Sequence, residues 1–485
     1  MNNTYFNHLN FTINERKNTL KNILDILVNN KQKIINSLYL DLHKPQYESY
    51  FMEILQIENE IKYHLDYFES WLEERKWISP FKNMSLFFSG MGHSYVQRKP
   101  FGNVLIIGAW NYPLNLSLMP LIGAISAGNK SMVILPDFDY THHTTNLLIK
   151  LFNIPKLNKY VIFSNGGEKN VKKMLKYKWD LIFYTGSKKV GKFIYESAAS
   201  QLTPTILELG GKSPCVIDEE INELLVRRIV WGKLTNSGQT CIAPDYFLVK
   251  DCVKDKFLKM LVKTINEFYG KDPQKSECYA RIINSKSLNR LKNIIDNDKP
   301  FLYHGGKIDI KNLYIEPTII DFKNDKINFH KSACMADEIF GPIFPIYSYN
   351  NVFENIEIIN KYKNPLTAYL FCKNSKGLSE FIKSGSIVIN DTLMQMNSST
   401  PFGGIGDSGI GNYHGKYSFD SFTYQKSILK RYKYGEINLR FPPYTKIKYD
   451  QLLLFSKYVT KKNRYTLLLF LLGFILLRKA YISMY

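Results

Sequence analysis

Five short apolar runs, each separated from the next by a segment long enough for a helix, constrain the fold of this chain most strongly. Strands that are apolar on both faces and alternate with helices are typical of a parallel sheet covered on both sides. Such sheets bind ligands beyond the carboxyl ends of their strands, and polar or glycine residues follow three of the runs. The runs are 104–107, 132–135, 160–163, 181–184 and 205–207, and the polar stretches are 108–111, 185–187 and 208–211. The pattern predicts an α/β fold with a ligand site at that edge.

The length of 485 residues exceeds what one hydrophobic core supports, so two domains with additional segments are expected. Before the first run, Leu20, Ile23, Leu24 and Leu27 have helical spacing, and a second helix is predicted from about 47 to 71. Strand-like alternation around a Gly-Met-Gly turn predicts a hairpin arm, and this alternation returns after about residue 420. The predicted segments are a helical lead-in (1–80), an arm (81–100), a first α/β domain (101–210), a second (211–420), the rest of the arm (421–445) and a tail (446–485).

Two motifs, ELGGKSP at 208–214 and NSGQTC at 236–241, combine a carboxylate, a thiol and several glycines. A thiolate is a strong nucleophile near neutral pH, and a carboxylate beside it can take a proton from the thiol or from water. Glycines let the backbone bend sharply and approach a ligand closely. Cys241 and Glu208 are therefore candidate catalytic residues, although a lone cysteine is more often an inert buried side chain.

The composition narrows the choice of partners. The formal charge of +21 suits nucleic acid or an anionic membrane, but lysine, asparagine, isoleucine and tyrosine are abundant along the whole chain. Compositional drift accounts for most of the excess, and no nucleic-acid partner is expected. The six cysteines contain no CxxC pair, which fits a reducing compartment. No histidine or cysteine pair has zinc-ligand spacing and no apolar run opens the chain, so neither a metal nor a signal peptide is expected.

Two glycine motifs resemble nucleotide-binding patterns but are interpreted differently. The segment 186–193 (GSKKVGKF) is one residue away from a phosphate-binding loop, but Phe193 replaces the hydroxyl that would hold magnesium. A nucleoside triphosphatase is therefore not expected, although the start of the following helix can hold the pyrophosphate of a dinucleotide. The segment 404–409 (GIGDSG) follows no apolar run and is interpreted as a tight loop.

Taken together, eight motifs resemble the aldehyde dehydrogenase family, in the family's order and over roughly residues 15 to 445. Their details resemble the class 3, fatty-aldehyde branch, as in the segments 41–44 (DLHK), 110–113 (WNYP), 238–246 (GQTCIAPDY) and 411–416 (GNYHGK). The resemblance implies an NAD-binding domain at 101–210, a catalytic domain at 211–420 and an oligomerisation arm that exchanges strands in a homodimer. The eight motifs are 100–102 (PFG), 108–113 (GAWNYP), 184–191 (YTGSKKVG), 208–214, 236–241, 338–342 (EIFGP), 364–366 (NPL) and 401–404 (PFGG).

The resemblance also implies roles for individual residues. Cys241 would attack the aldehyde carbon, and the Asn111 amide and the Cys241 backbone N–H would bind the oxyanion of the thiohemiacetal. Hydride transfer would then give a thioester, and Glu208 would activate the water that releases the acid. Glu338 either shares that role, as in class 3, or holds the nicotinamide ribose while Phe340 contacts the ring. The expected reaction is oxidation of medium- to long-chain aldehydes to carboxylic acids with NAD or NADP.

The cofactor site departs from the family pattern at one position. Gly186, Ser187 and Gly191 would line the pyrophosphate, but the family's Lys-Pro-Ser-Glu, which binds the adenosine ribose, is replaced by ILPDF at 134–138. Asp137 or Asp139 would accept a ribose hydroxyl instead, and an acid there disfavours a 2′-phosphate. NAD is therefore predicted over NADP. The missing lysine also leaves open a catalytically impaired, membrane-associated binding or scaffold protein with the same fold.

The tail combines a basic run with twelve uncharged residues at 466–477. As a helix this segment measures roughly 18 Å, short of the roughly 30 Å of a bilayer core. Basic residues beside an apolar segment suit the anionic cytoplasmic leaflet. Fatty aldehyde dehydrogenases resemble this layout, so lipid binding is predicted on the cytoplasmic side of an intracellular membrane, with the endoplasmic reticulum favoured. The alternatives are a helix that packs over the substrate mouth and a cytoplasmic protein.

Overall fold

The structure is a computed structural model that describes residues 11–73, 92–218, 220–431, 433 and 438–458. The chain divides into two compact units, one of 1–69 and 100–423 and the other of 70–99 and 424–485. They are called the main unit and the arm unit.

A six-stranded sheet with the order β16-β6-β5-β2-β3-β4 carries one half of the main unit. Its strands are parallel except for β16, which is antiparallel to β6. The five apolar runs predicted as strands all lie in this sheet, and all five residues of β2 are buried. The strands are β2 (Asn103–Ile107), β3 (Lys130–Ile134), β4 (Val161–Ser164), β5 (Leu181–Gly186), β6 (Thr205–Leu209) and β16 (Gly409–Ile410).

Strand β16 lies in the first sheet, although the second α/β domain was predicted to extend to residue 420. Instead, Gly409 pairs with Glu208 and Ile410 with Leu207 at the edge of the first sheet. Helix α17 (Gly415–Ser421) then packs on α5 (Asn115–Ala127), where a Cβ on Gly123 would lie 2.5 Å from the Cβ of Ser418. A two-residue strand has no hydrophobic pattern that predicts its partner.

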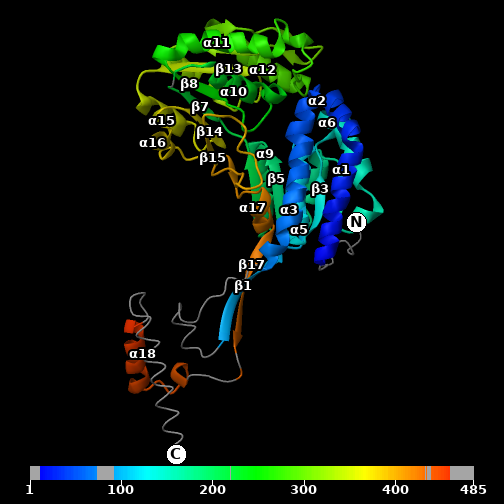
Figure 1. Cartoon of the computed structure of the whole chain (residues 1–485), viewed down its shortest axis with the longest axis vertical. Coiled ribbons are helices and arrows are strands. Elements are labelled where there is room, and N and C mark those ends of the chain that lie inside the picture. The colour runs from blue at the N-terminus through cyan, green and yellow to red at the C-terminus, as the bar shows by residue number, and fades with distance from the viewer. Residues whose placement is uncertain (1–10, 74–91, 219, 432, 434–437, 459–485) are drawn as a thin grey trace, which may run out of the picture. The chain divides into compact units, whose positions relative to one another are not determined.

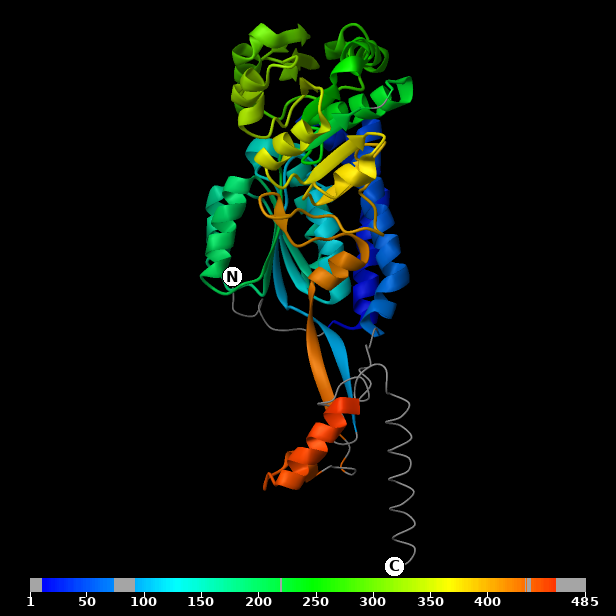
Figure 2. The same cartoon turned by 90° about the vertical axis from the view of Figure 1, so that its left-hand side faces the viewer.

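Helices cover both faces of this sheet, as a doubly wound α/β fold requires. Helix α9 lies on the side opposite to α1 and α3 (Figure 2). Helix α1 begins with a capping box, in which Thr12 Oγ1 accepts the Glu15 N–H at 3.2 Å and Glu15 accepts the Thr12 N–H at 2.9 Å. The remaining helices of this half are α1 (Ile13–Leu42), α3 (Leu55–Glu73), α6 (Phe138–Phe152), α7 (Pro155–Asn158), α8 (Glu168–Met174) and α9 (Lys188–Ala199).

The second predicted helix is interrupted by a π-helical turn. A single turn α2 (Gln46–Glu48) leads into the π-helical segment η2 (Ser49–Ile54), which continues as α3. The wider turn changes which residues face inward, and Glu53 is buried between Met52 and Ile54. Such turns often occur at functional sites.

A seven-stranded sheet with the order β15-β14-β7-β8-β13-β12-β9 carries the other half of the main unit (Figure 1). It is parallel except for β9, which is antiparallel to β12. A short pair, β10 (Ile308–Asp309) and β11 (Tyr314–Ile315), stands apart from it. The strands are β7 (Pro214–Ile217), β8 (Tyr246–Lys250), β9 (Leu302–His304), β12 (Thr318–Asp321), β13 (Ile343–Tyr349), β14 (Thr367–Phe371) and β15 (Ser386–Ile389).

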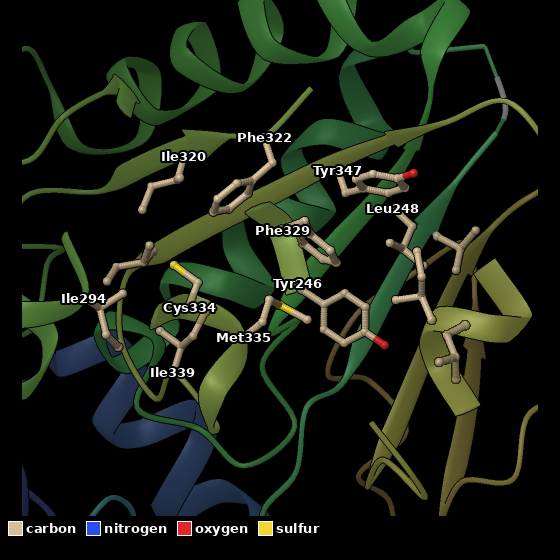
Figure 3. Packing of buried hydrophobic residues seen from close by; sticks show 14 of the residues in the cluster. Tyr246, Leu248, Ile294, Ile320, Phe322, Phe329, Cys334, Met335, Ile339 and Tyr347 are labelled. Atoms are coloured by element: carbon tan, nitrogen blue, oxygen red, sulfur yellow. The ribbon is translucent and has the colours of Figure 1, made fainter. Parts of the chain in front are cut away.

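Successive residues of strand β8 enter two different cores, one on each face of this sheet. Tyr246 and Leu248 belong to the cluster of Figure 3, together with Phe329 and Met335, whereas Phe247 and Val249 belong to the cluster on the other face. The helical segments of this half are α10 (Glu223–Leu234), η4 (Thr235–Gly238), α11 (Asp251–Tyr269), η5 (Pro273–Lys275), α12 (Ser285–Asn297), η6 (Lys299–Phe301), α13 (Lys326–Lys331), α14 (Ala333–Ala336), α15 (Val352–Lys361) and α16 (Ser375–Ser379).

The arm is a two-stranded sheet of β1 (Gly92–Pro100) and β17 (Thr423–Arg431). The short helix η7 (Asn438–Arg440) and helix α18 (Lys446–Tyr458) follow it in the arm unit. Residues 81–91 of the predicted arm and the apolar tail segment at 466–477 lie outside the described residues. Within the described ranges, none of the helices is both long enough and apolar enough to cross a bilayer.

Candidate active site

The nucleophile candidate Cys241 follows a left-handed turn. Asn236, Ser237 and Gly238 have φ angles of +53°, +52° and +75°. Two consecutive non-glycine residues in this region are uncommon, because the Cβ atom crowds the backbone there. The turn is therefore maintained by contacts outside it, and it determines where the thiol lies.

Those contacts come mainly from the segment 280–283. Ser237 Oγ donates to the Ala280 oxygen at 2.7 Å. The buried Gln239 side chain donates to the Arg281 oxygen and accepts the Ile283 N–H, both at 2.9 Å. A Gln239 amide with both ends bonded fixes the backbone two residues before the thiol.

Asn111, which follows strand β2, reaches the same turn. Its Nδ2 donates to the Gln239 backbone oxygen at 3.0 Å, and its own backbone oxygen accepts Nδ2 of Asn236 at 2.9 Å. The Asn111 side chain is buried. An amide nitrogen carries two N–H groups, so one holds the side chain in place and the second can donate to a ligand at Cys241.

Two carboxyl groups, those of the buried Glu208 and the half-buried Glu338, influence the thiol. Burial raises the pKa of Glu208 well above its usual value, and among the described residues neither of its oxygens has a hydrogen-bond partner. Burial and the charge of Asp245 raise the pKa of Glu338 to about 8. Burial, followed by the charges of Glu338 and Glu208, raises the pKa of Cys241. The thiol is thus protonated at neutral pH, and the two carboxyl groups near it can accept its proton only when they are ionised.

Strand β16 holds the backbone that carries Glu208. The Leu209 N–H donates to the Ser408 oxygen at 3.0 Å, next to the pairing of Gly409 with Glu208. The segment 404–409, interpreted from sequence as a tight loop, is such a loop and ends in β16. Its close packing explains the glycines, since a Cβ on Gly404 would lie 2.2 Å from the Ser408 oxygen.

A cavity of about 550 Å³ brings most of the sequence candidates together at the carboxyl ends of β2, β5 and β6. Gly191 is absent from its lining, because it packs on strand β6 instead, where a Cβ would lie 2.6 Å from a methyl group of Leu209. The predicted contact of Gly191 with the pyrophosphate is therefore replaced by helix–strand packing. The predicted residues that do line the cavity are Asn111, Gly186, Ser187, Glu208, Cys241, Glu338 and Phe340.

The cavity has features that fit a dinucleotide. Ser187 caps the twelve-residue helix α9, and free N–H groups at a helix start favour phosphate. Lys188, Lys189 and Arg290 add positive charge to the lining. The ring of Phe340 lies edge-on to Trp110, with 5.4 Å between centroids, and both line the cavity, so a planar ring has aromatic neighbours there.

The divergent segment after strand β3 lies outside this lining. Asp137 caps helix α6, and its Oδ1 accepts the Asp139 N–H at 3.3 Å. Its other oxygen would lie 2.8 Å from a Cβ on Gly167. Asp139 is exposed. Asp137 and Asp139 were the two residues predicted to bind the ribose. The structure shows that Asp137 caps a helix and that Asp139 is exposed to solvent.

A second, narrower cavity of about 40 Å³ also reaches Cys241. The thiol therefore lies between two cavities, one with charged and polar walls and one with mainly apolar walls. The second cavity is lined by Met52, Gln56, Tyr112, Asn115, Leu116, Met119, Thr240, Cys241, Ile242, Met396, Phe402, Tyr413 and His414.

Lys212, which lies in the 208–214 motif, forms a structural ion pair. The buried ammonium pairs with Asp245 and also donates to the Cys334 and Asp337 backbone oxygens at 2.8 and 3.0 Å. Asp245 accepts the Ile339 N–H at 2.8 Å. The pair therefore fixes the backbone on both sides of Glu338.

Sequence reasoning missed several residues that support the site. Gln239 and Asn236 lie in the 236–241 motif and Lys44 in the 41–44 motif, but neither motif indicates the contacts of these side chains. For Glu53 the available signal is a charged residue between two apolar ones in a predicted helix. Their contacts join segments far apart in the sequence, so no local pattern revealed them.

A buried Ser–His–Glu arrangement elsewhere is structural. His64 Nδ1 lies 2.8 Å from Ser126 Oγ, and its Nε2 lies 3.2 Å from Glu60 Oε1. All three side chains are buried, and none of them lines either cavity. Glu60 also accepts hydrogen bonds from Ser398 and Gly415, so the cluster ties helix α3 to the segment before α17.

Comparison with known proteins shows the family to which the chain belongs. The sequence profile of the aldehyde dehydrogenase family matches residues 6–428. Aldehyde dehydrogenase family 3 comG of Dictyostelium discoideum is 40% identical and covers 89% of this chain and 91% of its own. The 4,4′-diaponeurosporen-aldehyde dehydrogenase of Staphylococcus aureus is 39% identical and covers 90% and 94%.

Solved structures agree with these relatives. The substrate-bound Staphylococcus aureus AldH superposes with a TM-score of 0.85 at 37% identity and covers 91% of this chain and 95% of its own. An NAD⁺ complex of an aldehyde dehydrogenase from Bacillus cereus gives 0.76 at 25% identity and covers 87% and 85%. The chain therefore belongs to the aldehyde dehydrogenase family, and it is an enzyme that oxidises aldehydes with a nicotinamide cofactor.

Proposed function

We propose that this enzyme oxidises medium- to long-chain aldehydes to carboxylic acids with NAD, through an acyl group carried on Cys241. The observation that supports this most directly is the position of the thiol between a polar cavity of about 550 Å³ and a narrow, mainly apolar one. A cofactor and an alkyl chain can then approach the same sulfur from different sides.

In the first half of the reaction, Cys241 loses its proton to the ionised form of Glu208 or Glu338, which passes the proton to solvent, and the thiolate attacks the aldehyde carbon. The C–S bond forms as the carbonyl electrons move to oxygen. The second N–H of Asn111 and the backbone N–H of Cys241 donate to that oxyanion, where a fixed donor is most effective. Asn111 is suited to this role because Gln239 already fixes its orientation.

The residues that would hold the cofactor are Ser187 and Gly186 at the start of α9, with Glu338 and Phe340 at the end near the thiol. When bound, the nicotinamide accepts the hydride that leaves the aldehyde carbon. Cys241 is then acylated as a thioester.

In the second half, a water molecule attacks the thioester and Cys241 leaves as a thiolate. Glu208 is suited to take the proton of that water, because its oxygens are buried, have no hydrogen-bond partner among the described residues and interact electrostatically with Cys241. Glu338 shares this task or orients the cofactor. Its backbone is held by the Lys212–Asp245 pair, which restricts its movement.

The second cavity supports the proposed substrate class. Three methionines line it together with Leu116, Ile242 and Phe402, and flexible apolar walls suit an alkyl chain. The substrate in the name of the Staphylococcus aureus relative, 4,4′-diaponeurosporen-aldehyde, is consistent with a large apolar aldehyde.

Membrane association and a homodimer complete the proposal. The tail carries six basic residues from 446 to 464 ahead of its apolar segment, which suits an anionic membrane surface. The two-stranded arm of β1 and β17 suits strand exchange between subunits. Sedimentation with anionic vesicles, with and without residues 446–485, tests the first claim, and analytical ultracentrifugation tests the second.

The experiment for the activity itself follows NADH formation with aldehydes of increasing chain length. Wild type should turn over NAD and prefer medium and long chains, and Cys241→Ala should be inactive with all of them. A folded wild type that turns over only short aldehydes would overturn the substrate class. Activity retained in Cys241→Ala would overturn the mechanism.

A further inference from the structure

One of the most deeply buried charges of the main unit lies behind the proposed oxyanion site. The Lys44 side chain has no exposed surface, and its ammonium lies 2.6 Å from Glu53 Oε1. The same nitrogen donates to the Asn111 backbone oxygen at 2.9 Å and lies 4.1 Å from the centre of the Tyr112 ring. A lysine has three donors, and these three contacts use its full capacity.

Glu53 connects this cation to the start of helix α5. Its Oε2 accepts the N–H groups of Leu114 and Asn115 at 2.9 and 3.2 Å. The π-helical turn η2 brings Glu53 to this position. One carboxylate therefore holds Lys44 with one oxygen and the beginning of α5 with the other.

The segment between strand β2 and helix α5 is thus fixed at two points. Lys44 binds its middle, at the Asn111 oxygen, and Glu53 binds its end. Asn236 also donates to the Asn111 oxygen, so this oxygen receives hydrogen bonds from two directions. The backbone of Asn111 has little freedom to rotate, and the direction of its side-chain amide follows from that of its backbone.

A buried ion pair is weak evidence for a role in stability, because apolar residues of similar volume often replace such pairs without loss. What the pair supplies here is a fixed direction for the Asn111 carbonyl. We infer that Lys44 is a positioning residue for aldehyde oxidation, which acts by holding the Asn111 backbone so that its amide donates to the oxyanion. The inference rests on the role proposed above for Asn111.

The test is a double-mutant cycle between Lys44 and Asn111. Lys44→Met should lower kcat/KM for an aldehyde about 10- to 100-fold, since a small misplacement of a catalytic group has effects of that order. In an Asn111→Ala background, Lys44→Met should change kcat/KM by less than about threefold, because the amide through which Lys44 acts is absent. The rate of Cys241 alkylation by iodoacetamide, which forms no oxyanion, should remain that of wild type.

The chain offers a matched control in Lys31. Its ammonium pairs with Glu58 of helix α3 at 3.5 Å and lies 4.4 Å from the ring of Tyr50 in η2, so it has the same kinds of partner as Lys44, at a more exposed position and without a contact to Asn111. Lys31→Met should leave kcat/KM unchanged. If Lys44→Met does not fold, Lys44→Met/Glu53→Gln removes both charges and keeps an acceptor for the start of α5, and the same loss is expected.

Three results would overturn the inference: a kcat/KM for Lys44→Met within about threefold of wild type, an equal loss in the Asn111→Ala background, or a parallel loss of alkylation rate. A normal kcat/KM in Asn111→Ala alone would instead refute the role proposed for Asn111. A loss in Asn111→Ala without a loss in Lys44→Met would refute only the inference on Lys44.

Discussion

Nδ2 of Asn111 donates to the backbone oxygen of Gln239 at 3.0 Å, two residues before the thiol of Cys241. The bond joins a segment that follows strand β2 to the left-handed turn that follows helix α10. Because Gln239 is itself anchored to Arg281 and Ile283, the amide is oriented before any substrate arrives. Preorganised donors of this kind are the most effective at an oxyanion.

Removal of this amide should affect the chemistry and not the thiol. Asn111→Ala is expected to lower kcat/KM about 10²- to 10³-fold, the usual effect of losing one oxyanion donor. Asn111→Asp, which has nearly the same shape but no N–H, should lose as much. Iodoacetamide alkylation of Cys241 in Asn111→Ala serves as the control, and a parallel fall in that rate would indicate a collapsed site.

The raised pKa of Glu338 predicts the pH dependence of the free enzyme. Burial and the charge of Asp245 raise this pKa to about 8, so the group is protonated at neutral pH and becomes a proton acceptor only above that value. kcat/KM should therefore rise with pH and show an inflection near 8. Glu338→Gln should remove this inflection, and an unchanged profile in the variant would exclude Glu338 as its source.

The narrow cavity predicts where chain-length selection occurs. Met396 lines it and is only half-buried, so Met396→Trp should fold and obstruct the cavity. The variant is expected to lower kcat/KM for a long-chain aldehyde more than about tenfold, with less than about a threefold change for a short one. Met394→Trp, at an exposed position outside the lining, is the matched control. Equal losses for both chain lengths would place the alkyl chain elsewhere.

The choice between NAD and NADP should depend on the start of helix α6. Asp137 caps that helix, which leaves the exposed carboxylate of Asp139 as the group that would repel a 2′-phosphate. Wild type should prefer NAD, and Asp139→Asn should reduce the ratio of kcat/KM values for NAD and NADP by about tenfold. Asp137→Asn should lower the stability of the protein, because it alters the cap of helix α6, and should leave the ratio of kcat/KM values nearly unchanged. A ratio unaffected by Asp139→Asn would remove the residue from cofactor selection.

Much of this site could be predicted from sequence because its chemistry lies in short motifs. Glu208 and Asn111 follow apolar runs, and the edge rule for parallel sheets predicted both at one edge. Cys241 ends a glycine-containing motif and was predicted from its chemistry and its resemblance to the family motif. Strand β16 could not be predicted, since two residues carry no periodicity and their partner lies about 200 positions earlier. Gly191 is a case in which a sequence pattern was misleading. It lies in a segment that resembles a phosphate-binding loop, but it packs against Leu209.

The buried supports were also beyond single-sequence reasoning. Nothing local indicates that Lys44 contacts Asn111, 67 positions away, or that Gln239 contacts Arg281. The π-helical turn that brings Glu53 inward changes the helical period for six residues only, which a search for regular spacing does not detect. These contacts depend on tertiary packing and were found only in the structure.

The most direct test of the central claim is to trap the acyl group on Cys241. In Glu208→Gln, Glu338 remains to take the thiol proton, so the variant should pass through aldehyde attack and oxidation but release the acid slowly, because the base for the attacking water is missing. After incubation with a long-chain aldehyde and NAD, mass spectrometry of this variant should find one acyl group, located on the peptide that contains Cys241 and absent in Glu208→Gln/Cys241→Ala. A folded Glu208→Gln variant that forms NADH without acylation of Cys241, or with the acyl group on another residue, would contradict the account.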